Sequence, residues 1–514
     1  MQHLAILPIL IPLLAGVLLL LPPLHGSLIR QRLGSLAALL VLLGVSIIQL
    51  LEAASGTISV YSLGDWPAPF GIILVLDRLS ALMVLLTGIL GLAAAVYACV
   101  DDDKQGEFFH PLLQFQLMGI NGAFLTGDLF NLFVFFEVLL IASYALVIHG
   151  GGKLKTRASL HYVTLNLVGS SLFLFALGTL YGTLGTLNMA DMARQVAQLS
   201  ADERPLVEAG ALLLLVVFSL KAAAFPLYFW LPSTYSSVAA PVAALFAIMT
   251  KVGIYSILRV YSLIFGSTAG ALADLASPWL WPMAILTMLA ATAGILASPS
   301  LRQQIAYLVI LSVGVLLGGL ALNTEQGTTA LLYYLLHTTL VSAGLFLLAD
   351  LIAHQRGQAG DRIVGHPLPR PVLFGTLFCI AAIAMIGMPP LSGFIGKALL
   401  LQAAGTETSK LWLWPPLLLS SLLVLIALSR TGSTLFWRGG DLSAKPARIA
   451  PVKLAATITL LLAAPALSLM AGPVTAYAQA TAAQLHQPTQ LINRVLAPDQ
   501  KPQETSPDAT GDHP

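Results

Sequence analysis

The chain has 514 residues, of which 57% are hydrophobic and only 9% are charged, whereas a soluble globular protein carries about 25% charged residues. With a mean hydropathy of +0.87, this composition excludes an ordinary soluble protein and indicates a membrane protein. The net charge of +2 gives no reason to expect nucleic-acid binding. Cys99 and Cys379 both fall inside apolar runs, so neither a disulfide framework nor a cysteine-ligated metal or iron–sulfur site is expected.

Apolar runs long enough to cross a hydrocarbon core of about 30 Å recur along most of the chain. Splitting them at polar or Pro- and Gly-rich interruptions predicts about fourteen transmembrane helices and an all-α fold. The first run lacks a basic start and a small-residue cleavage site, which indicates a membrane span and not a signal peptide. The predicted spans are 4–21, 33–51, 73–98, 112–127, 129–149, 160–182, 206–229, 237–264, 280–297, 303–321, 328–351, 372–402, 411–429 and 451–472.

Lysine and arginine residues in the loops predict the orientation, since cytoplasmic loops carry the excess of these residues. The inner loops are richer in both if the amino terminus lies outside, which favours both termini on the outer side and an even number of spans. The polar segment from Gln479 to Pro514 is rich in Pro, Asp and Thr. We expect it to be disordered or bound to a partner.

Proline interrupts two of the predicted spans. The seventh contains Lys221-Ala-Ala-Ala-Phe-Pro226, and the twelfth contains Pro389 and Pro390 ahead of Lys397. A broken helix is tolerated in a bilayer only where it is buried in protein or lines a watery cavity, and paired breaks in two repeats usually mark a transport site. The breaks lie five spans apart, so the two helices cross in opposite directions, as an inverted repeat of about five helices requires. The alternative is that each proline merely kinks its helix.

Few ionisable residues lie well inside the predicted spans, and they form the candidate site: Glu137, Lys221, Lys251, His337 and Lys397. Each charge at the centre of a bilayer costs about 2.5–3.5 kcal/mol even on the most lenient scale. These side chains should therefore face the interior of the bundle and be paired or hydrated. An intramembrane ionisable residue is by default a candidate for a proton or ion pathway.

Glu137 lies in the apolar and aromatic run Phe130-Asn-Leu-Phe-Val-Phe-Phe-Glu137, where its carboxylate needs a cation. Lys221 is the nearest candidate by depth, so the two are expected to form a pair. Such a pair acts as a switch, because a carboxylate separated from its cation in an apolar setting is driven to take up a proton. The alternative is a structural ion pair that fixes helix packing.

Lys251 lies near the centre of its span, where an ammonium cannot reach the membrane interface and the side chain is suited to proton exchange. His337 is the weakest of the five candidates, since a lone histidine in a helical bundle is more often a hydrogen-bonded core residue. Arg259 and Asp350 lie closer to the ends of their spans, which indicates interfacial positions.

The sequence carries no Walker-type phosphate loop, no strand-framed GxGxxG, no HExxH and no CxxC. We therefore expect no cofactor and no enzymatic activity of the chain's own. Uphill transport would have to draw on an ion gradient or on partner subunits.

Three stretches resemble one known family: Gly127–Tyr144 around Glu137, Gly185-Thr-Leu-Asn-Met-Ala-Asp191, and Lys221-Ala-Ala-Ala-Phe-Pro226-Leu-Tyr-Phe-Trp-Leu-Pro232. They are similar to the D-type subunits of Mrp-type (Mnh/Pha) cation/proton antiporters. That family is related to the antiporter-like proton-pumping subunits of respiratory complex I and of membrane-bound hydrogenases. The similarity extends over about residues 1–475.

The resemblance implies fourteen helices with two inverted five-helix repeats, each containing a broken helix. It implies N-terminal helices in 1–111, repeats in 112–264 and 280–429, a last transmembrane helix in 451–475 and a polar tail in 476–514. It also implies that Glu137, Lys221, Lys251, His337 and Lys397 form a proton relay. The implied partners are other antiporter subunits, the lipid bilayer, H⁺ and Na⁺, and the implied location is a bacterial inner membrane.

Two other functions compete with the subunit of a multisubunit monovalent cation/proton antiporter. One is a proton-pumping membrane subunit of a complex I-like NADH:quinone oxidoreductase or a membrane-bound hydrogenase, in which redox chemistry elsewhere drives the same relay. The other is a passive scaffold, which leaves the buried charges unexplained. No cluster of carboxylates and carbonyls marks a Na⁺ site, so Na⁺ movement is expected to depend on partner subunits.

Overall fold

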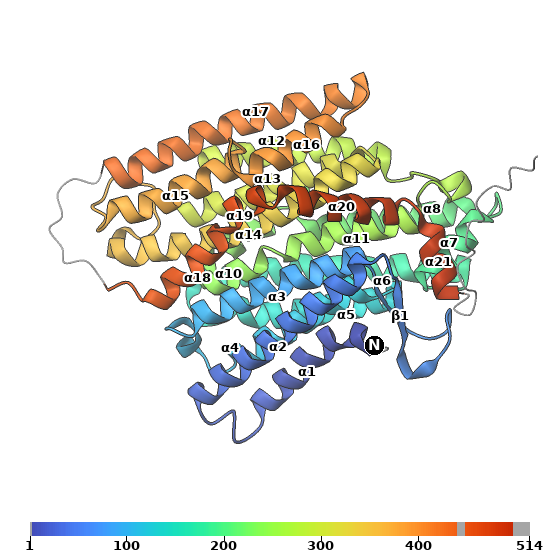
Figure 1. Cartoon of the computed structure of the whole chain (residues 1–514), viewed down its shortest axis with the longest axis horizontal. Coiled ribbons are helices and arrows are strands. Elements are labelled where there is room, and N and C mark those ends of the chain that lie inside the picture. Colours follow the sequence, from blue (N-terminus) through green and yellow to red (C-terminus); the bar gives the residue numbers. More distant parts are fainter. Residues whose placement is uncertain (1–2, 439–447, 497–514) are drawn as a thin grey trace, which may run out of the picture.

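The computed structural model describes residues 3–438 and 448–496. Its long helices run in one general direction (Figure 1). The helices of the first half are α1 (Leu7–Leu20), α2 (Leu28–Ala54), α3 (Arg78–Ala98), α4 (Phe109–Leu125), α5 (Leu129–Ile148), α6 (Lys153–Leu184), α7 (Met189–Ala197), α8 (Arg204–Ala222), α9 (Trp230–Ser237), α10 (Ala240–Phe246) and α11 (Met249–Leu263).

The helices of the second half are α12 (Ser277–Ala297), α13 (Leu301–Ala321), α14 (Glu325–Arg356), α15 (Pro371–Ile386), α16 (Ser392–Ala403), α17 (Glu407–Gly432), α18 (Pro451–Leu461), α19 (Ala463–Leu469), α20 (Ala471–Leu485) and α21 (Pro488–Leu496). Eleven helices among the described residues are long and apolar enough to cross a membrane, and two shorter apolar helices cover Leu4–Leu20 and Pro371–Ile386. The chain is therefore a multi-pass membrane protein with a mostly helical fold.

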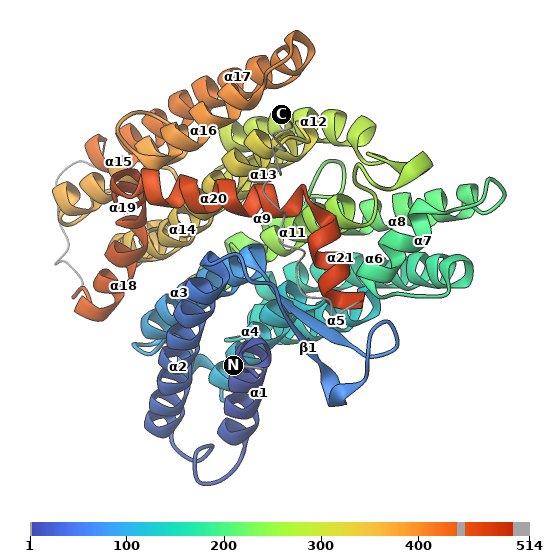
Figure 2. The same cartoon turned by 45° about the vertical axis from the view of Figure 1, so that its right-hand side comes forward.

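A two-stranded antiparallel hairpin marks one end of the helices (Figures 1 and 2). Its strands are β1 (Ser59–Ser62) and β2 (Ile73–Leu76), with Ser59 opposite Leu76. We call this end of the molecule the hairpin face. The ring of His3 packs on Tyr61 of β1, and Val495 of α21 lines a pocket together with β2. Both described ends of the chain therefore lie on the same face.

Polar caps begin several helices at this face. Asp77 caps α3 in a capping box with Ser80, Asp128 caps α5 by accepting the amide of Asn131, and Asn188 caps α7. Each cap satisfies backbone amides that would otherwise lack partners at a helix start. The segments before α5 and α7 also pair with each other through a bridge between Asp128 and Asn188.

Burial separates the helices into a centre and a periphery. In the most hydrophobic stretches of α10–α11, α13 and α14, 100%, 89% and 89% of the residues are buried. In those of α2, α6, α12 and α17, only 28–39% of the residues are buried. The peripheral helices present apolar side chains outward, as a lipid-facing surface requires. Lys251 and His337 thus belong to the innermost helices of the bundle.

The span predicted over 237–264 agrees with the apolar helical stretch Ala240–Leu263, in which a turn at 247–248 separates α10 from α11. Two other expectations need correction. The span predicted over 73–98 begins instead at Arg78, because residues 73–76 form β2. The segment from Gln479 is helical through α20 and α21, with buried residues such as Ala482 packed on the body, and its remaining part, 497–514, lies outside the described residues.

Gly253 brings α11 close to the end of α8. A Cβ at this position would lie 2.5 Å from the backbone nitrogen of Ala222, so Gly253→Ala is expected to destabilise the protein by about 1–3 kcal/mol through overpacking. The check is the unfolding temperature of the solubilised protein. Gly178→Ala is the control, because its Cβ would meet nothing within 4 Å; equal unfolding temperatures for the two variants would contradict the prediction.

Candidate functional site

The first helix break lies directly after Lys221. This lysine stands in the last turn of α8, and the chain leaves the helical conformation at Ala223, whose φ is +59°. The residues up to α9 include Pro226, and Phe225 donates its amide to the hydroxyl of Thr287 at 2.9 Å. The last carbonyls of a helix carry partial negative charge, so this position suits an ammonium group.

Glu137 and Lys221 meet through a serine and not directly. Ser170 of α6 donates a hydrogen bond to the Glu137 carboxylate, and the Lys221 ammonium lies 3.5 Å from the same hydroxyl. Lys221 also donates to the backbone and side-chain oxygens of Asn166, both at 3.3 Å. No ion pair between Glu137 and Lys221 occurs in the described structure. The expected pair is therefore a bridged one.

Lys251 is the third residue of α11 and is fully buried. Within the described residues its ammonium has one hydrogen-bond acceptor, the hydroxyl of Ser312 on α13 at 3.0 Å. A charged ammonium can donate three hydrogen bonds. Lys251 is thus less fully solvated by protein than Lys221.

His337 lies on α14, opposite the second helix break. Its Nδ1 is 2.8 Å from the hydroxyl of Ser392, at the start of α16, and its side chain is buried. Gly393 allows this approach, since a Cβ there would clash with the carbonyl oxygen of Ala384 and would lie 2.9 Å from Nε2 of His337. The histidine is therefore packed against the break itself.

Lys397 reaches back from α16 to the broken end of α15. Its ammonium donates to the carbonyl of Ile386 at 2.7 Å and to the hydroxyl of Ser421 at 2.8 Å, with the carbonyl of Met385 at 3.4 Å. Pro389 and Pro390 lie between the two half-helices. In both breaks, then, a lysine is placed at the carboxyl end of the first half-helix.

A serine hydroxyl lies within hydrogen-bond distance of every one of the five ionisable groups. Ser170 serves both Glu137 and Lys221, and the other three are Ser312, Ser392 and Ser421. A hydroxyl both donates and accepts hydrogen bonds, so it can receive a proton on one side and release one on the other. Each ionisable group and its hydroxyl can therefore exchange a proton locally without a metal or an organic cofactor.

Similarity to known proteins identifies the family of the chain. Residues 126–424 match the family model described as "NADH:quinone oxidoreductase/Mrp antiporter, TM". The chain is 40% identical to the D-type subunit of a probable K(+)/H(+) antiporter of Rhizobium meliloti (strain 1021), over 97% of this chain and 98% of the relative. The chain belongs to the NADH:quinone oxidoreductase/Mrp antiporter family.

Two further members of the NADH:quinone oxidoreductase/Mrp antiporter family are similar along most of the chain. The D-type subunit of the Na(+)/H(+) antiporter of Bacillus subtilis (strain 168) is 39% identical over 87% of this chain and 89% of that protein. A chain of the Mrp complex from Dietzia sp. DQ12-45-1b superposes with a TM-score of 0.86 at 27% identity, over 96% of this chain and 99% of that chain. The fold is thus shared with a member of a multisubunit complex.

Sequence reasoning missed the four serines and Asn166. Serine is common in these spans, and many serine hydroxyls bond only the backbone of their own helix, as Ser219 does to Leu215. The hydrophobic periodicity of a helix does not distinguish a serine that bonds its own backbone from one that bonds an ionisable side chain on another helix. The only signal in the sequence for any of these partner residues was that Ser170 follows Gly169. The missing side chain of Gly169 lets α6 approach Leu220 of α8.

Ser170→Ala is expected to lower proton-coupled transport about tenfold, because a hydrogen bond to a charged group is worth about 1.5–3 kcal/mol and its loss separates Glu137 from Lys221. Transport by the assembled complex in vesicles is the measurement. Ser171→Ala is a matched control, since the neighbouring hydroxyl is exposed and bonds the carbonyl of Leu167. Equal rates for both variants would show that Ser170 does not connect the pair.

Cys99, Asp103 and His110 place one ligand atom each within 4.8 Å of one another. Arg32 occupies both oxygens of the Asp103 carboxylate at 2.6 and 2.7 Å, and Nε2 of His110 is 3.1 Å away. Burial alone would raise the pKa of the Asp103 carboxyl, but the bonds from Arg32 and His110 lower it to about 2. The guanidinium already supplies the positive charge that a metal ion would bring, so this cluster serves as an ion-pair network.

Arg259 and Asp350 differ from each other in their surroundings. Arg259 is 4% exposed and forms a buried bidentate pair with Asp77, the residue that caps α3 at the hairpin face. Asp350 is partly buried, and it accepts from Arg302 at 2.5 Å and from the Tyr97 hydroxyl at 2.7 Å. It lies at the face opposite the hairpin and ties the ends of α3, α13 and α14 together.

Proposed function

We propose that the chain is the proton-translocating subunit of a multisubunit monovalent cation/proton antiporter in a bacterial inner membrane. Protons move along Glu137, Lys221, Lys251, His337 and Lys397. The fold has fourteen transmembrane helices, ten of which form two inverted five-helix repeats that carry this relay, and both termini lie on the outer side. The chain acts as a transporter subunit, and cation movement depends on partner subunits.

The observation that supports this proposal most is the pairing of each buried ionisable group with a serine hydroxyl. Groups that only stabilise the fold would gain more from direct ion pairs, as Asp77 and Arg259 do. Groups that must change protonation state need a partner that accommodates both states, and a hydroxyl does so by rotating.

The contact between Lys221, Ser170 and Glu137 supports a specific first step. Lys221 gives a proton to the Ser170 oxygen while the Ser170 hydroxyl gives its proton to Glu137. The products are a neutral amine, an unchanged serine and a neutral carboxylic acid, so two opposite buried charges are replaced by two neutral groups. Burial disfavours charged forms, so the neutral pair lies close in free energy to the charged pair. The arrival of a proton at a neighbouring relay group then shifts the equilibrium between them.

The longer intervals of the relay require water or side-chain movement, since the hydrogen bonds given for Lys251, His337 and Lys397 in the described residues do not join these groups to one another. Lys251 suits proton transfer through water, because in the described structure its ammonium has one hydrogen-bond acceptor from the protein. Lys397 lies beyond the second break on α16, which runs towards the hairpin face. In the proposed topology this face is outside, so Lys397 is the outer end of the path.

The test is exchange by the whole complex in liposomes with a pH-sensitive dye inside. Adding NaCl or KCl outside a vesicle with acidic contents is expected to alkalinise the interior without NADH, quinone or hydrogen. Proton movement that occurs only with a redox substrate would contradict the proposal and favour the oxidoreductase subunit. The chain reconstituted alone is expected to show no cation-dependent proton movement.

A further inference from the structure

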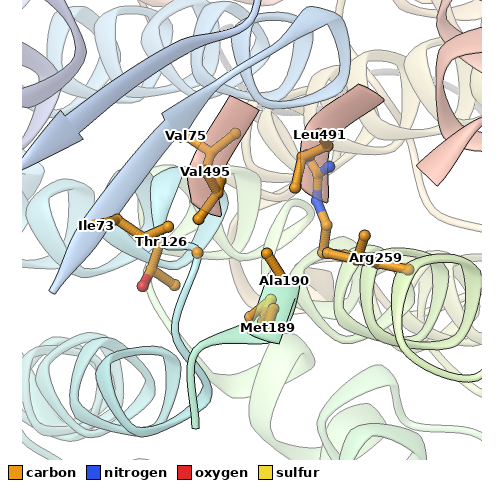
Figure 3. Close-up of a pocket in the computed structure, with 10 residues that line it drawn as sticks. Ile73, Val75, Thr126, Met189, Ala190, Arg259, Leu491 and Val495 are labelled. Atoms are coloured by element: carbon orange, nitrogen blue, oxygen red, sulfur yellow. The ribbon is translucent and has the colours of Figure 1, made fainter. Parts of the chain in front are cut away.

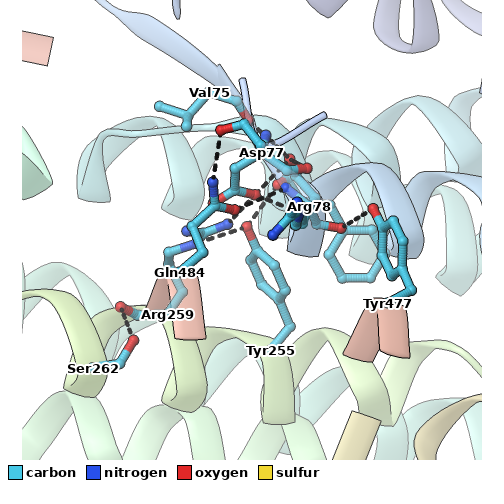
Figure 4. Close-up of polar contacts among 11 residues, drawn as sticks. Val75, Asp77, Arg78, Tyr255, Arg259, Ser262, Tyr477 and Gln484 are labelled. Atoms are coloured by element: carbon cyan, nitrogen blue, oxygen red, sulfur yellow. Dashed lines mark hydrogen bonds and ion pairs between the residues drawn. The ribbon is translucent and has the colours of Figure 1, made fainter. Parts of the chain in front are cut away.

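The hairpin-face end of α11 is closed by a buried ion pair that the relay does not use. Arg259 donates two hydrogen bonds to the carboxylate of Asp77, at 2.6 and 2.8 Å, and its Nε lies 3.2 Å from the hydroxyl of Tyr255. Both charged side chains are at most 5% exposed. Figure 4 shows this cluster between the start of α3 and helix α11.

Arg259 stands in line with Lys251 on the same helix. Lys251, Tyr255 and Arg259 follow one another at intervals of four residues, which places them along one side of α11. Eight residues of helix span about 12 Å. The hydroxyl of Tyr255 is held between them and donates to the carbonyl of Phe124 at 2.6 Å. A polar stripe therefore runs from Lys251 to the hairpin face and ends at the ion pair.

A pocket lies on the other side of Arg259. Figure 3 shows Arg259 facing side chains from β2, α7 and α21, and the lining includes Thr126, Met189, Leu491 and Val495. The side chains from α21 form one wall of this pocket, which is at the hairpin face. Arg259 thus occupies the boundary between the polar stripe and the hairpin-face surface.

The carboxyl-terminal helices lock this arrangement in place. Tyr477 donates its hydroxyl to the carbonyl of Arg78, and the amide of Arg78 donates to Gln484 at 3.2 Å. The guanidinium of Arg78 in turn donates to the carbonyl of Ala480 at 3.1 Å. Helix α20 is therefore fastened to the residue that follows Asp77.

We propose that the Asp77–Arg259 pair is an electrostatic seal that prevents protons from passing between Lys251 and the hairpin-face surface. The inference rests on the proposed function. Arg259 is permanently protonated, so it blocks the stripe with a charge that cannot shuttle a proton. Asp77 neutralises this charge and holds the guanidinium across the stripe, which makes Arg259 a positioning and barrier residue outside the relay.

Asp77 itself becomes a proton carrier if Arg259 is lost. Burial would raise the pKa of the Asp77 carboxyl, but the Arg259 charge and the bonds from Arg259 and Ser80 hold it below its usual value. The other titratable groups around the carboxyl are Arg78, Tyr255 and Tyr477. Without Arg259, none of these donates a bidentate pair, and the buried carboxyl takes up and releases protons.

Passive proton leak through the purified complex in liposomes tests the seal. Arg259→Gln is expected to raise the leak about tenfold, the effect of about 1.4 kcal/mol on a barrier, and Arg259→Lys is expected to raise it less. Asp77→Asn/Arg259→Gln is expected to leak less than Arg259→Gln, because the titratable carboxyl is gone, but more than the unchanged complex, because the barrier charge is gone as well. Asparagine also caps helices as well as aspartate does.

Arg194→Gln is the matched control, since Arg194 pairs with Asp191 on the same face with a 54% exposed side chain. Asp77→Asn alone keeps the Arg259 cation and is expected to remain tight. If Arg259→Gln does not assemble, Arg259→Lys decides the matter, because a raised leak supports the seal and an unchanged leak overturns it. A tight Arg259→Gln complex would overturn the seal, and so would a double variant as tight as the unchanged complex, since that variant lacks the barrier charge. Cation-driven exchange by the unchanged complex is measured separately, so failure of the proposed function is distinguishable.

Discussion

Replacing Glu137 by glutamine is expected to reduce cation/proton exchange about 100-fold or more, the contribution of a positioned acid–base group, while the complex still assembles. Glutamine keeps the shape and can still accept from Ser170, but it cannot take the proton that Lys221 passes on. Lys221→Ala is expected to have the same effect from the other side of the hydroxyl. The measurement is cation-dependent pH change in vesicles, normalised to the amount of complex.

The surface pair of Glu407 and Lys410 provides the control for both variants. It contains the same two residue types at 2.8 Å, with side chains 92% and 38% exposed. Glu407→Gln and Lys410→Ala are expected to leave exchange unchanged. Normal exchange by Glu137→Gln or Lys221→Ala would show that the bridged pair is structural.

Lys397→Ala is expected to reduce cation/proton exchange as strongly as Glu137→Gln does, because it removes the terminal group of the proton relay. The carbonyls of Met385 and Ile386 and the Ser421 hydroxyl would lose their donor, and leaving such groups unpaired costs about 1–3 kcal/mol each. Lys397→Met also leaves these acceptors unpaired, but it fills the space of the lysine stem and so avoids the additional cavity that alanine creates. Both variants should be inactive, and Lys397→Met should assemble better than Lys397→Ala.

Thiol labelling tests the side to which Lys397 opens. Lys397→Cys is made in a chain whose Cys99 and Cys379 are replaced by alanine. A membrane-impermeant reagent is expected to react from the hairpin face, and reaction only from the opposite face would contradict the proposed position of the outer end.

The residues that bear charge could be found from the sequence, whereas their immediate partners could not. Glu137, Lys221 and Lys397 stand out because an ionisable group in an apolar run has a large and specific cost. Ser170 and Ser421 carry no such signal, because a serine in a membrane helix can satisfy itself on its own backbone.

The same limit applies to packing between distant segments. The helix breaks are marked by Pro226 and Pro389, since proline removes a backbone donor and disrupts a helix. By contrast, the pairing of Asp77 with Arg259 joins residues 182 positions apart, and no local pattern encodes it. The position of Arg259 near the end of its span could be predicted from the sequence, but its partner could not. The helical tail was missed for a similar reason, since Tyr477 and Gln484 contact Arg78 far upstream.

The contact between Gln484 and Arg78 has a consequence for biosynthesis. The two residues are 406 positions apart, so the start of α3 enters the membrane long before the residues that fasten it have been translated. At about 5–20 residues per second, this delay lasts tens of seconds. During this time the nascent chain exposes the buried groups around Asp77 to the insertion machinery or to chaperones. Ribosomes stalled before the codons of α20 should therefore yield chains that proteases cut at residues 56–58, before β1. Completion of the carboxyl-terminal helices should protect these residues, because Gln484 and Arg494 bond the carbonyls of Gly56 and Ile58.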